Sequence, residues 1–216
     1  MKILEFVPVE KTPEKKQPGV VYFPNVQGCT TLADKISRMK GYDFDYAVFR
    51  HADTTIETPE ALEVNCNRMR MDNVGVAGVI GTLFMSESCA WWLHKRCVVT
   101  AGAIMQGDGK GGAYPMIDGA GYRADAVGVD GCFMVFSREF IARYEAHPYH
   151  WRFGYDLDAC FQALSMGMKV GILDIRVRHD SQGSFDSKEF DEYRQKFLAR
   201  WKPHVDFPVI AQSTFR

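Results

Sequence analysis

No apolar stretch in this sequence is long enough to cross a membrane, and neither sign of charge dominates it. The apolar residues near the start are too few for the core of a signal peptide, and no small-residue cleavage site follows them. The formal net charge of -1 gives no general attraction to nucleic acid or to an anionic membrane, and leaves open a local basic patch. We therefore expect a soluble, cytoplasmic protein with no membrane span.

Two common site motifs are also missing. The six cysteines all stand singly, and the absence of a CxxC pair argues against a zinc ribbon and a thioredoxin-type site. The glycine-rich stretch "GDGKGG", residues 107–112, does not have the GxxxxGK[ST] spacing of a phosphate loop. We interpret the whole glycine-dense segment 101–124 as a mobile loop over a site.

What the sequence does contain is an alternation of apolar runs with segments of helical spacing. This alternation predicts an α/β fold with a central, mostly parallel sheet and helices on both faces, and we expect residues 1–216 to form one domain. The runs expected to be strands are 20–23, 45–49, 74–82, 126–136 and 169–179. The segments expected to be helices are 30–41, 58–71, 138–144, 155–167 and 187–201.

Side chains that can bind a cation follow two of the predicted strands. His51 and Asp53 come directly after strand 45–49, and His179 ends the last strand. Because ligands collect at the carboxyl ends of strands in α/β sheets, we expect these residues to face one crevice. An imidazole and a carboxylate together can bind a divalent cation. The plain alternative is a surface turn with a helix-capping aspartate and a histidine satisfied within the core.

Two further pairs of residues suggest a site. Asp156 and Asp158 lie in the first turn of a predicted helix, where carboxylates are favoured for capping alone. Because they are two positions apart, one can serve the helix while the other points into a cleft as a general base. Trp91 and Trp92 are adjacent and cannot both enter the same core, so one of them can stack on a sugar at a cleft wall.

Five segments follow one another in a recognisable order: "DYAVFRHADTTI", "VGVAGVIGT" with the later "WW", "VGVDGCFMVFSREF", "FGYDLDACFQALSMGMKVGIL" and "VRHDSQGS". In this order they resemble the GT-A-type glycosyltransferases, in particular the family 2-like group of nucleotide-sugar transferases. The resemblance covers about residues 45–185. It implies a GT-A-like, Rossmann-type sandwich with a shortened N-terminal donor half, because only about 45 residues precede the segment that resembles the DxD motif.

The resemblance also implies a metal site and a catalytic base. Asp53 matches the last aspartate of the DxD motif, His51 stands where its first aspartate usually stands, and His179 matches the late metal-ligating histidine. These three residues would then hold Mn²⁺ or Mg²⁺. Asp156 matches the aspartate that acts as catalytic base in inverting members, and Tyr155 stands where a glutamate usually precedes it.

The same resemblance implies residues that contact the donor. The segment "VVYFPN" stands in for the first strand of the family, which would place three residues near the nucleotide base. Asp130 would lie beside a sugar, and we assign the cleft-wall tryptophan to Trp92. The three residues near the base are Phe23, Pro24 and Asn25.

The activity implied is metal-dependent transfer of a hexose or pentose from a nucleotide-sugar donor, such as a UDP-sugar, to a hydroxyl acceptor. The acceptor stays open between a glycan, a protein, a small molecule and a modified nucleic-acid base. Two alternatives remain: a nucleotidyl- or phosphoryl-transferring enzyme on a related fold, and a catalytically decayed module that only binds nucleotide sugars.

Overall fold

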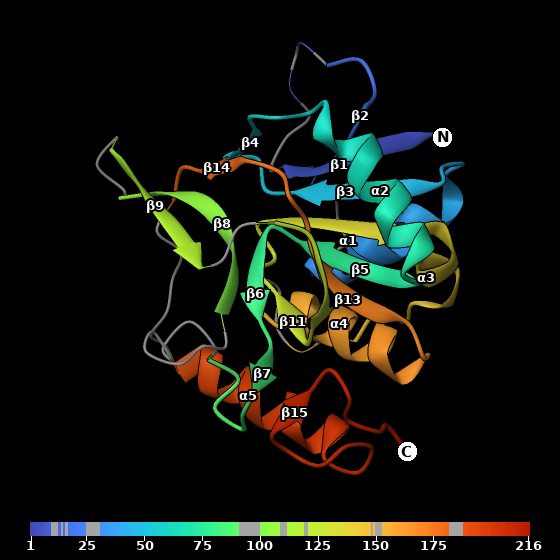
Figure 1. Cartoon of the computed structure of the whole chain (residues 1–216), viewed down its shortest axis with the longest axis vertical. Coiled ribbons are helices and arrows are strands. Elements are labelled where there is room, and N and C mark those ends of the chain that lie inside the picture. The colour runs from blue at the N-terminus through green and yellow to red at the C-terminus, as the bar shows by residue number, and fades with distance from the viewer. Residues whose placement is uncertain are drawn as a thin grey trace.

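The computed structural model describes residues 1–9, 13, 15, 17–24, 31–90, 100–108, 112–118, 121–147, 149, 153–181 and 188–216. Its centre is a seven-stranded sheet with the order β10-β13-β5-β12-β3-β1-β2 (Figure 1). The strands are β1 (Ile3–Val9), β2 (Val20–Pro24), β3 (Tyr46–Arg50), β5 (Val74–Gly78), β10 (Arg123–Ala126), β12 (Phe133–Ser137) and β13 (Lys169–Ile172).

Most strands of this sheet run in one direction, but the central strand does not. β12 lies antiparallel between β3 and β5, and β10 runs antiparallel to β13 at one edge. The remaining pairs are parallel: β1 pairs with β2 and β3, and β13 pairs with β5. The predicted α/β class and largely parallel sheet are therefore confirmed. Two strands run in the opposite direction, β12 in the middle and β10 at one edge.

A second, six-stranded sheet lies beside the first and has the order β11-β6-β8-β14-β4, with β9 paired to β8. A short two-stranded sheet pairs β15 with β7. The strands of these sheets are β4 (Thr54–Ile56), β6 (Ile80–Thr82), β7 (Phe84–Met85), β8 (Thr100–Gly107), β9 (Ala113–Asp118), β11 (Gly128–Val129), β14 (Val177–His179) and β15 (Val209–Ile210).

Helices cover both faces of the large sheet. The α-helices are α1 (Leu32–Arg38), α2 (Ala61–Met71), α3 (Arg138–Arg143), α4 (Tyr155–Ser165) and α5 (Lys188–Trp201), and a 3-10 turn, η1 (Met39–Gly41), follows α1. No helix in the described part of the chain is both long and apolar enough to cross a membrane.

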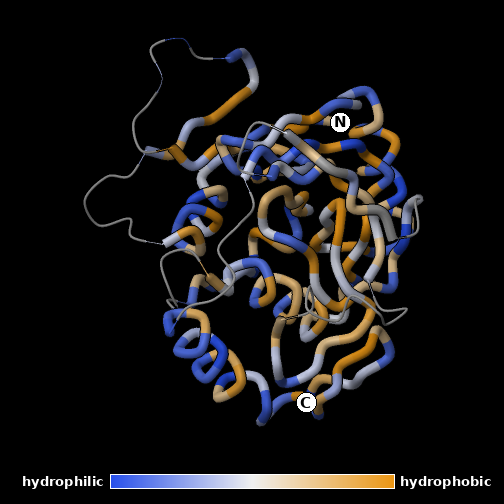
Figure 2. Tube along the Cα trace, turned by 90° about the vertical axis from the view of Figure 1, so that its left-hand side faces the viewer, coloured by the Kyte–Doolittle hydropathy of each residue, from blue (hydrophilic) through white to orange (hydrophobic). Residues whose placement is uncertain are grey.

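The strands bury alternate side chains on opposite faces, so each face has its own core. In β12, Phe133 and Val135 pack in the cluster that includes α2 and α5, whereas Met134 and Phe136 pack in the cluster that includes α1 and α3. The helix α4 contributes to both clusters. Figure 2 shows the hydrophobic stretches of the chain concentrated in the interior and hydrophilic ones outside.

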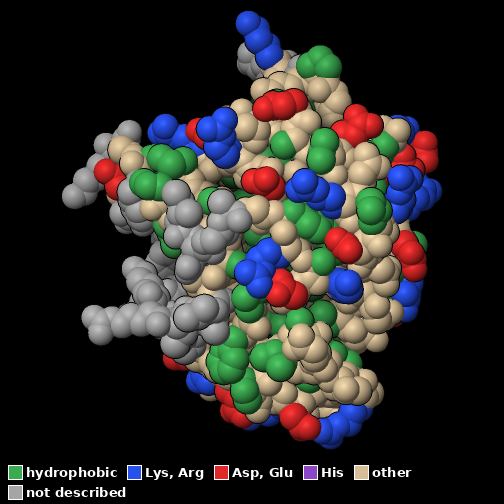
Figure 3. All heavy atoms as spheres, viewed as in Figure 1, with side chains coloured by type: hydrophobic (Ala, Val, Ile, Leu, Met, Phe, Trp, Pro, Cys, Tyr) green, Lys and Arg blue, Asp and Glu red, His purple; other side chains and the backbone are tan. Residues whose placement is uncertain are grey.

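Both signs of charge are interspersed over the face of the molecule in Figure 3, as the near-neutral net charge leads one to expect.

Three segments that we predicted as single strands each pass from one sheet to the other. Residues 74–82 divide into β5 and β6, residues 126–136 into β11 and β12, and residues 169–179 into β13 and β14. An apolar run indicates that a segment is buried, but it does not indicate which sheet supplies the hydrogen-bond partners of that segment. As a result, the segments that follow β5 and β13 of the large sheet continue as β6 and β14 of the small sheet.

The interpretation of segment 101–124 as a loop is wrong for its described part. Most of it forms the antiparallel pair β8 and β9, which stands at the left of Figure 1. Its glycines serve close packing of the backbone: Gly102 has a φ of +103°, and a Cβ at this residue would lie 2.1 Å from the carbonyl oxygen of Val79.

Two other predictions need correction. The inner strand β1 was not predicted, and residues Val20–Pro24 of "VVYFPN" form the edge strand β2 rather than the first strand of the sheet. Helix α2 begins at Ala61, later than the predicted segment 58–71, and the Thr58 hydroxyl accepts a hydrogen bond from the Arg176 backbone amide at 2.9 Å. The side chains of Thr31 and Ser137 cap the first turns of α1 and α3 by accepting hydrogen bonds from the Asp34 and Phe140 amides.

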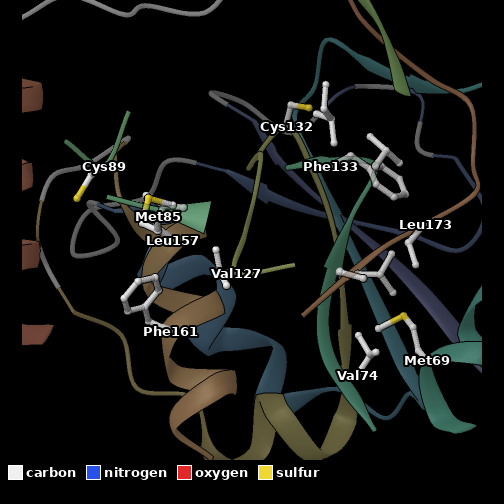
Figure 4. Packing of buried hydrophobic residues seen from close by; sticks show 14 of the residues in the cluster. Met69, Val74, Met85, Cys89, Val127, Cys132, Phe133, Leu157, Phe161 and Leu173 are labelled. Carbon is white, nitrogen blue, oxygen red and sulfur yellow. The ribbon is translucent and has the colours of Figure 1, made fainter. Parts of the chain in front are cut away.

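We predict that Phe161→Ala lowers the free energy of unfolding by about 3–5 kcal/mol. Phe161 on α4 is fully buried and belongs to the hydrophobic cluster shown in Figure 4. Its ring contacts those of Phe197 and Trp201 on α5 at centroid distances of 4.9 and 5.5 Å. Urea unfolding measures the change. Met71→Ala, at a methionine that is 83% exposed on α2, is the control and should change stability by less than about 0.5 kcal/mol. Similar losses in both variants would contradict this account of the core.

Candidate functional site

Three side chains that were candidates from the sequence lie together at the junction of the two sheets. His51 directly follows β3, and Asp53 directly precedes β4. β4 pairs antiparallel with β14 in a register that sets Thr54 opposite His179. The Asp180 amide also donates to the Asp53 carbonyl at 2.9 Å. Strand pairing therefore brings His179 to the end of the large sheet.

The ligand-forming atoms of His51, Asp53 and His179 lie within 4.8 Å of one another. His179 Nε2 is 3.6 Å from Asp53 Oδ1, and the two imidazole rings have a centroid distance of 5.6 Å. The His179 side chain is buried, whereas 44% of the Asp53 side chain is exposed. The cluster is therefore anchored in the fold on the histidine side and open to a ligand on the aspartate side.

The structure restrains His51 through both its backbone and its ring. Its amide donates to the Cys132 carbonyl at 2.9 Å, and its Nε2 lies 2.7 Å from the hydroxyl of Tyr155, the first residue of α4. Burial is the main reason why the pKa of His51 is lowered, and the nearby His179 adds to the effect. The imidazole is therefore neutral near pH 7, which is the form that binds metal ions.

His179 has partners on β8 and on the segment after β14. The Gln106 amide nitrogen lies 3.3 Å from His179 Nδ1 and also contacts the Ser181 carbonyl. The Ser181 hydroxyl lies 2.9 Å from His179 Nε2. These contacts orient the ring toward Asp53. The sequence carried no signal for Gln106, because it lies in the segment that we had interpreted as a loop.

Asp156 lies in the first turn of α4 and is partly exposed. Burial of the carboxyl, together with the nearby charge of Asp130, raises its pKa to about 7. The backbone amides of Leu157 and Gly131 act in the opposite direction, and Leu157 donates to Asp156 Oδ1 at 2.9 Å. Desolvation and the like charge outweigh the helix terminus, which would otherwise favour the carboxylate. Asp130 itself accepts from the Cys132 amide at 2.9 Å.

Asp158 serves the helix packing instead. It is buried, and its carboxylate accepts hydrogen bonds from side chains that hold α4 against α5 and against the segment before α4. The donors are Tyr149 Oη at 2.7 Å, Gln162 Nε2 at 2.7 Å, Trp201 Nε1 at 2.9 Å and Arg200 at 3.4 Å. The two aspartates of this helix thus have different surroundings, as their spacing predicted.

A groove of about 620 Å³ begins beside Asp53 and extends along the carboxyl ends of β1 and β2. Arg50, at the end of β3, forms an ion pair with Glu5 of β1 at 2.6 Å and donates to the Thr54 carbonyl at 2.8 Å. The groove is lined by Glu5, Val7, Val9, Pro13, Lys15, Gln17, Tyr22, Arg50, Ala52, Thr54, Thr55, Ile56 and Pro59. Glu5 and Arg50 were not among the residues singled out from the sequence.

The remaining candidates lie elsewhere or outside the described residues. Phe23 is buried, and its ring packs against Phe6 at a centroid distance of 5.3 Å and against Tyr42 at 6.0 Å. Its ring therefore belongs to the core. Pro24 ends β2 and is partly exposed. Asn25 and Trp92 lie outside the described residues.

Three of the solved structures that are similar to this chain illustrate the likeness. "Crystal structure of GalNAc-T7 with UDP, GalNAc and Mn2+" has a TM-score of 0.51 at 13% identity, over 86% of this chain and 39% of that one. A197 from STIV has a TM-score of 0.49 at 11% identity, over 100% and 94% of the two chains. The inositol-1-phosphate CTP transferase from T. maritima has a TM-score of 0.37 at 14% identity, over 83% and 67%.

At these identities the likeness to GalNAc-T7, a GT-A glycosyltransferase, shows the fold alone, and the present chain spans well under half of that protein. No protein with a curated description matches the chain. A family model described as "Glycosyltransferase like family" matches residues 22–201, which include β3, the cation-binding candidates and α4. The chain therefore belongs to the glycosyltransferase-like family.

Proposed function

We propose that this protein is a metal-dependent glycosyltransferase that moves a sugar from a nucleotide-sugar donor to a hydroxyl acceptor. The observation that carries the proposal is the cluster of His51, Asp53 and His179, which opens beside a groove in a chain of this family. The nucleotidyl-transfer alternative uses a similar cation, and the products of the reaction distinguish the two.

The donor atoms of the cluster fit a first-row transition ion. Two imidazole nitrogens and one carboxylate oxygen form a mixed set, whereas Mg²⁺ prefers oxygen ligands and retains several waters. We therefore favour Mn²⁺ over Mg²⁺, and Mn²⁺ is also named with UDP in the GalNAc-T7 structure. A divalent cation held here would offset the negative charge that develops on the leaving diphosphate, an effect of several kcal/mol.

The groove provides a place for the nucleoside of the donor. Ala52 and Thr54 line it and flank Asp53, so a nucleoside in the groove would have its diphosphate directed toward the cluster. Tyr22 and the Glu5–Arg50 ion pair offer an aromatic ring and polar groups along the walls. A UDP-sugar is the donor class that we propose.

Asp156 is the residue that we propose as general base. It lies at the start of α4, one position after the tyrosine that contacts His51, and so close to the cation cluster. A carboxylate whose pKa is raised to about 7 is a stronger base than an ordinary aspartate and can accept the proton of an acceptor hydroxyl. Asp130 raises that pKa by its charge and lines the same junction.

The test of the function is a screen of donor turnover over common nucleotide sugars. We expect the protein to release a nucleoside diphosphate in the presence of Mn²⁺ and to lose most of this activity in a chelator. Asp53→Ala should abolish the response to Mn²⁺, because the ion loses its carboxylate ligand. Release of a nucleoside monophosphate or of pyrophosphate would instead identify a nucleotidyl or phosphoryl transferase.

Asp180→Ala is the matched control for this experiment. Asp180 is an acidic residue on the adjoining segment, but its carboxylate pairs with Arg178 at 2.6 Å and is not part of the cluster. Its variant should keep the response to Mn²⁺. Nucleotide affinity that is equal in the wild type and in Asp53→Ala, with and without Mn²⁺, would contradict the assignment of the metal site.

A second prediction concerns the base. We expect Asp156→Asn to lower turnover by about 10²-fold or more while nucleotide and Mn²⁺ affinity stay near the wild-type values, because asparagine cannot accept the proton. Asp158→Asn makes the same chemical change two residues away and should keep turnover per folded molecule. It should lower stability, since an amide cannot accept all the hydrogen bonds that the buried carboxylate receives. Full activity in Asp156→Asn would place the base elsewhere.

Asp156→Asn should also change how stability depends on pH, which can be measured without any substrate. The carboxyl pKa is about 7 in the folded protein and about 4 in an unfolded chain. Between about pH 4 and about pH 7 the Asp156 carboxyl is ionised in the unfolded chain and still protonated in the folded protein. The free energy of unfolding therefore falls as the pH rises through this range.

The variant should therefore gain stability over the wild type progressively from about pH 4 to 7, and reach a constant gain of about 2–4 kcal/mol above that range. Chemical unfolding of both proteins in a chelator at several pH values measures the difference. A stability difference that does not vary with pH would show that the pKa of Asp156 is not raised.

A further inference from the structure

The hydroxyl of Tyr155 lies between two groups that leave only one arrangement for its proton. Tyr155 Oη is 2.9 Å from the Gly131 carbonyl oxygen and 2.7 Å from His51 Nε2. A carbonyl oxygen can only accept a hydrogen bond, so the single hydroxyl proton points to Gly131. The hydroxyl must then accept from His51, which places the imidazole proton on Nε2. Nδ1 is the nitrogen that keeps a free lone pair.

The surroundings hold the tyrosine in this position. Tyr155 is buried, and its ring meets Phe49 edge-on at a centroid distance of 6.0 Å. A Cβ added at Gly131 would lie 2.2 Å from the Tyr155 hydroxyl oxygen, so glycine at this position is what allows the hydroxyl to approach the turn. Gly131 is not among the glycines with positive φ. Glycine therefore matters at this position because it leaves room for the Tyr155 hydroxyl, not because of its backbone conformation.

We propose that Tyr155 is a positioning residue of the cation site, whose hydroxyl holds His51 in the tautomer and orientation that leave Nδ1 free to bind a divalent cation. The inference rests on the proposed cation site. In it, a neutral hydroxyl anchored on Gly131 takes the place of the carboxylate or carbonyl that commonly accepts the second N–H of a metal-binding histidine. Because Tyr155 precedes Asp156, the same turn of α4 positions both the cation ligand and the proposed base.

Two measurements on the metal-free and Mn²⁺-titrated protein test the proposal. Nitrogen-15 NMR of the imidazole groups at about pH 8, where histidine is neutral, reports the tautomer of His51 in the absence of metal. We expect the Nε2–H form in the wild type and a loss of that preference in Tyr155→Phe. Titration with Mn²⁺, followed by the electron paramagnetic resonance of the free ion, should show affinity about 10–100-fold weaker in this variant.

Gly131→Ala provides a second variant in which tyrosine is retained but displaced. It should weaken Mn²⁺ binding in the same direction as Tyr155→Phe, because the added methyl group occupies the place of the hydroxyl. Tyr193→Phe is the matched control: this tyrosine is also buried, and its hydroxyl has no hydrogen-bond partner among the described residues. It should leave Mn²⁺ affinity and the His51 tautomer unchanged. Thermal unfolding confirms that each variant is folded.

The outcomes separate this inference from the proposed function. Mn²⁺ binding that depends on Asp53 but is equal in the wild type and Tyr155→Phe, or an Nδ1–H tautomer in the wild type, overturns the role of Tyr155 alone. Absence of Mn²⁺ binding in the wild type overturns both proposals together. Weaker binding in Tyr155→Phe and in Gly131→Ala, with wild-type binding in Tyr193→Phe, supports the positioning role.

Discussion

The turn at residues 130–132 is the structural constraint on which the candidate site depends. It lies where the chain passes from β11 in the small sheet to β12 in the large sheet, and its backbone accepts hydrogen bonds from the site on both sides. The Cys132 carbonyl accepts from the His51 amide and from the Thr54 hydroxyl, and the Gly131 carbonyl accepts from Tyr155. One short turn thus connects β3, β4 and α4.

The same turn links the geometry of the site to its electrostatics. Asp130 folds back to accept from the Cys132 amide, and its charge adds to burial in raising the pKa of Asp156. Ionisation of the Asp156 carboxyl in this position is therefore unfavourable for the fold. Burial also raises the pKa of the neighbouring Asp158, but its carboxylate accepts hydrogen bonds from donors on three sides, which act in the opposite direction.

The two histidines of the cluster have unequal support. His51 has its backbone amide bound to the Cys132 carbonyl and its ring bound to a buried tyrosine that is itself anchored. His179 is buried and contacts Gln106 and Ser181, whose side chains can rotate to exchange donors and acceptors. The cluster thus combines one firmly held imidazole and one with adaptable partners, and its Asp53 side chain is exposed.

Much of the architecture could be predicted from local pattern. Helical spacing placed α1, α3, α4 and α5, because side-chain periodicity acts within a few residues. Strands β8 and β9 could not be recognised in this way, since the glycines of β8 reflect a close approach to Val79 and Asp180, which are distant in the sequence.

The sequence by itself determined the α/β class, the polar residues that follow the strands, and the order of motifs that resembles the glycosyltransferases. Only the tertiary structure decided which of these residues meet. Whether His179 reaches Asp53 depends on the pairing of β4 with β14, and whether Tyr155 can bond to His51 depends on the space left by Gly131. The physical reason is that burial and periodicity are properties of a segment, whereas a hydrogen-bond partner or a shared ligand is a property of two segments that fold against each other.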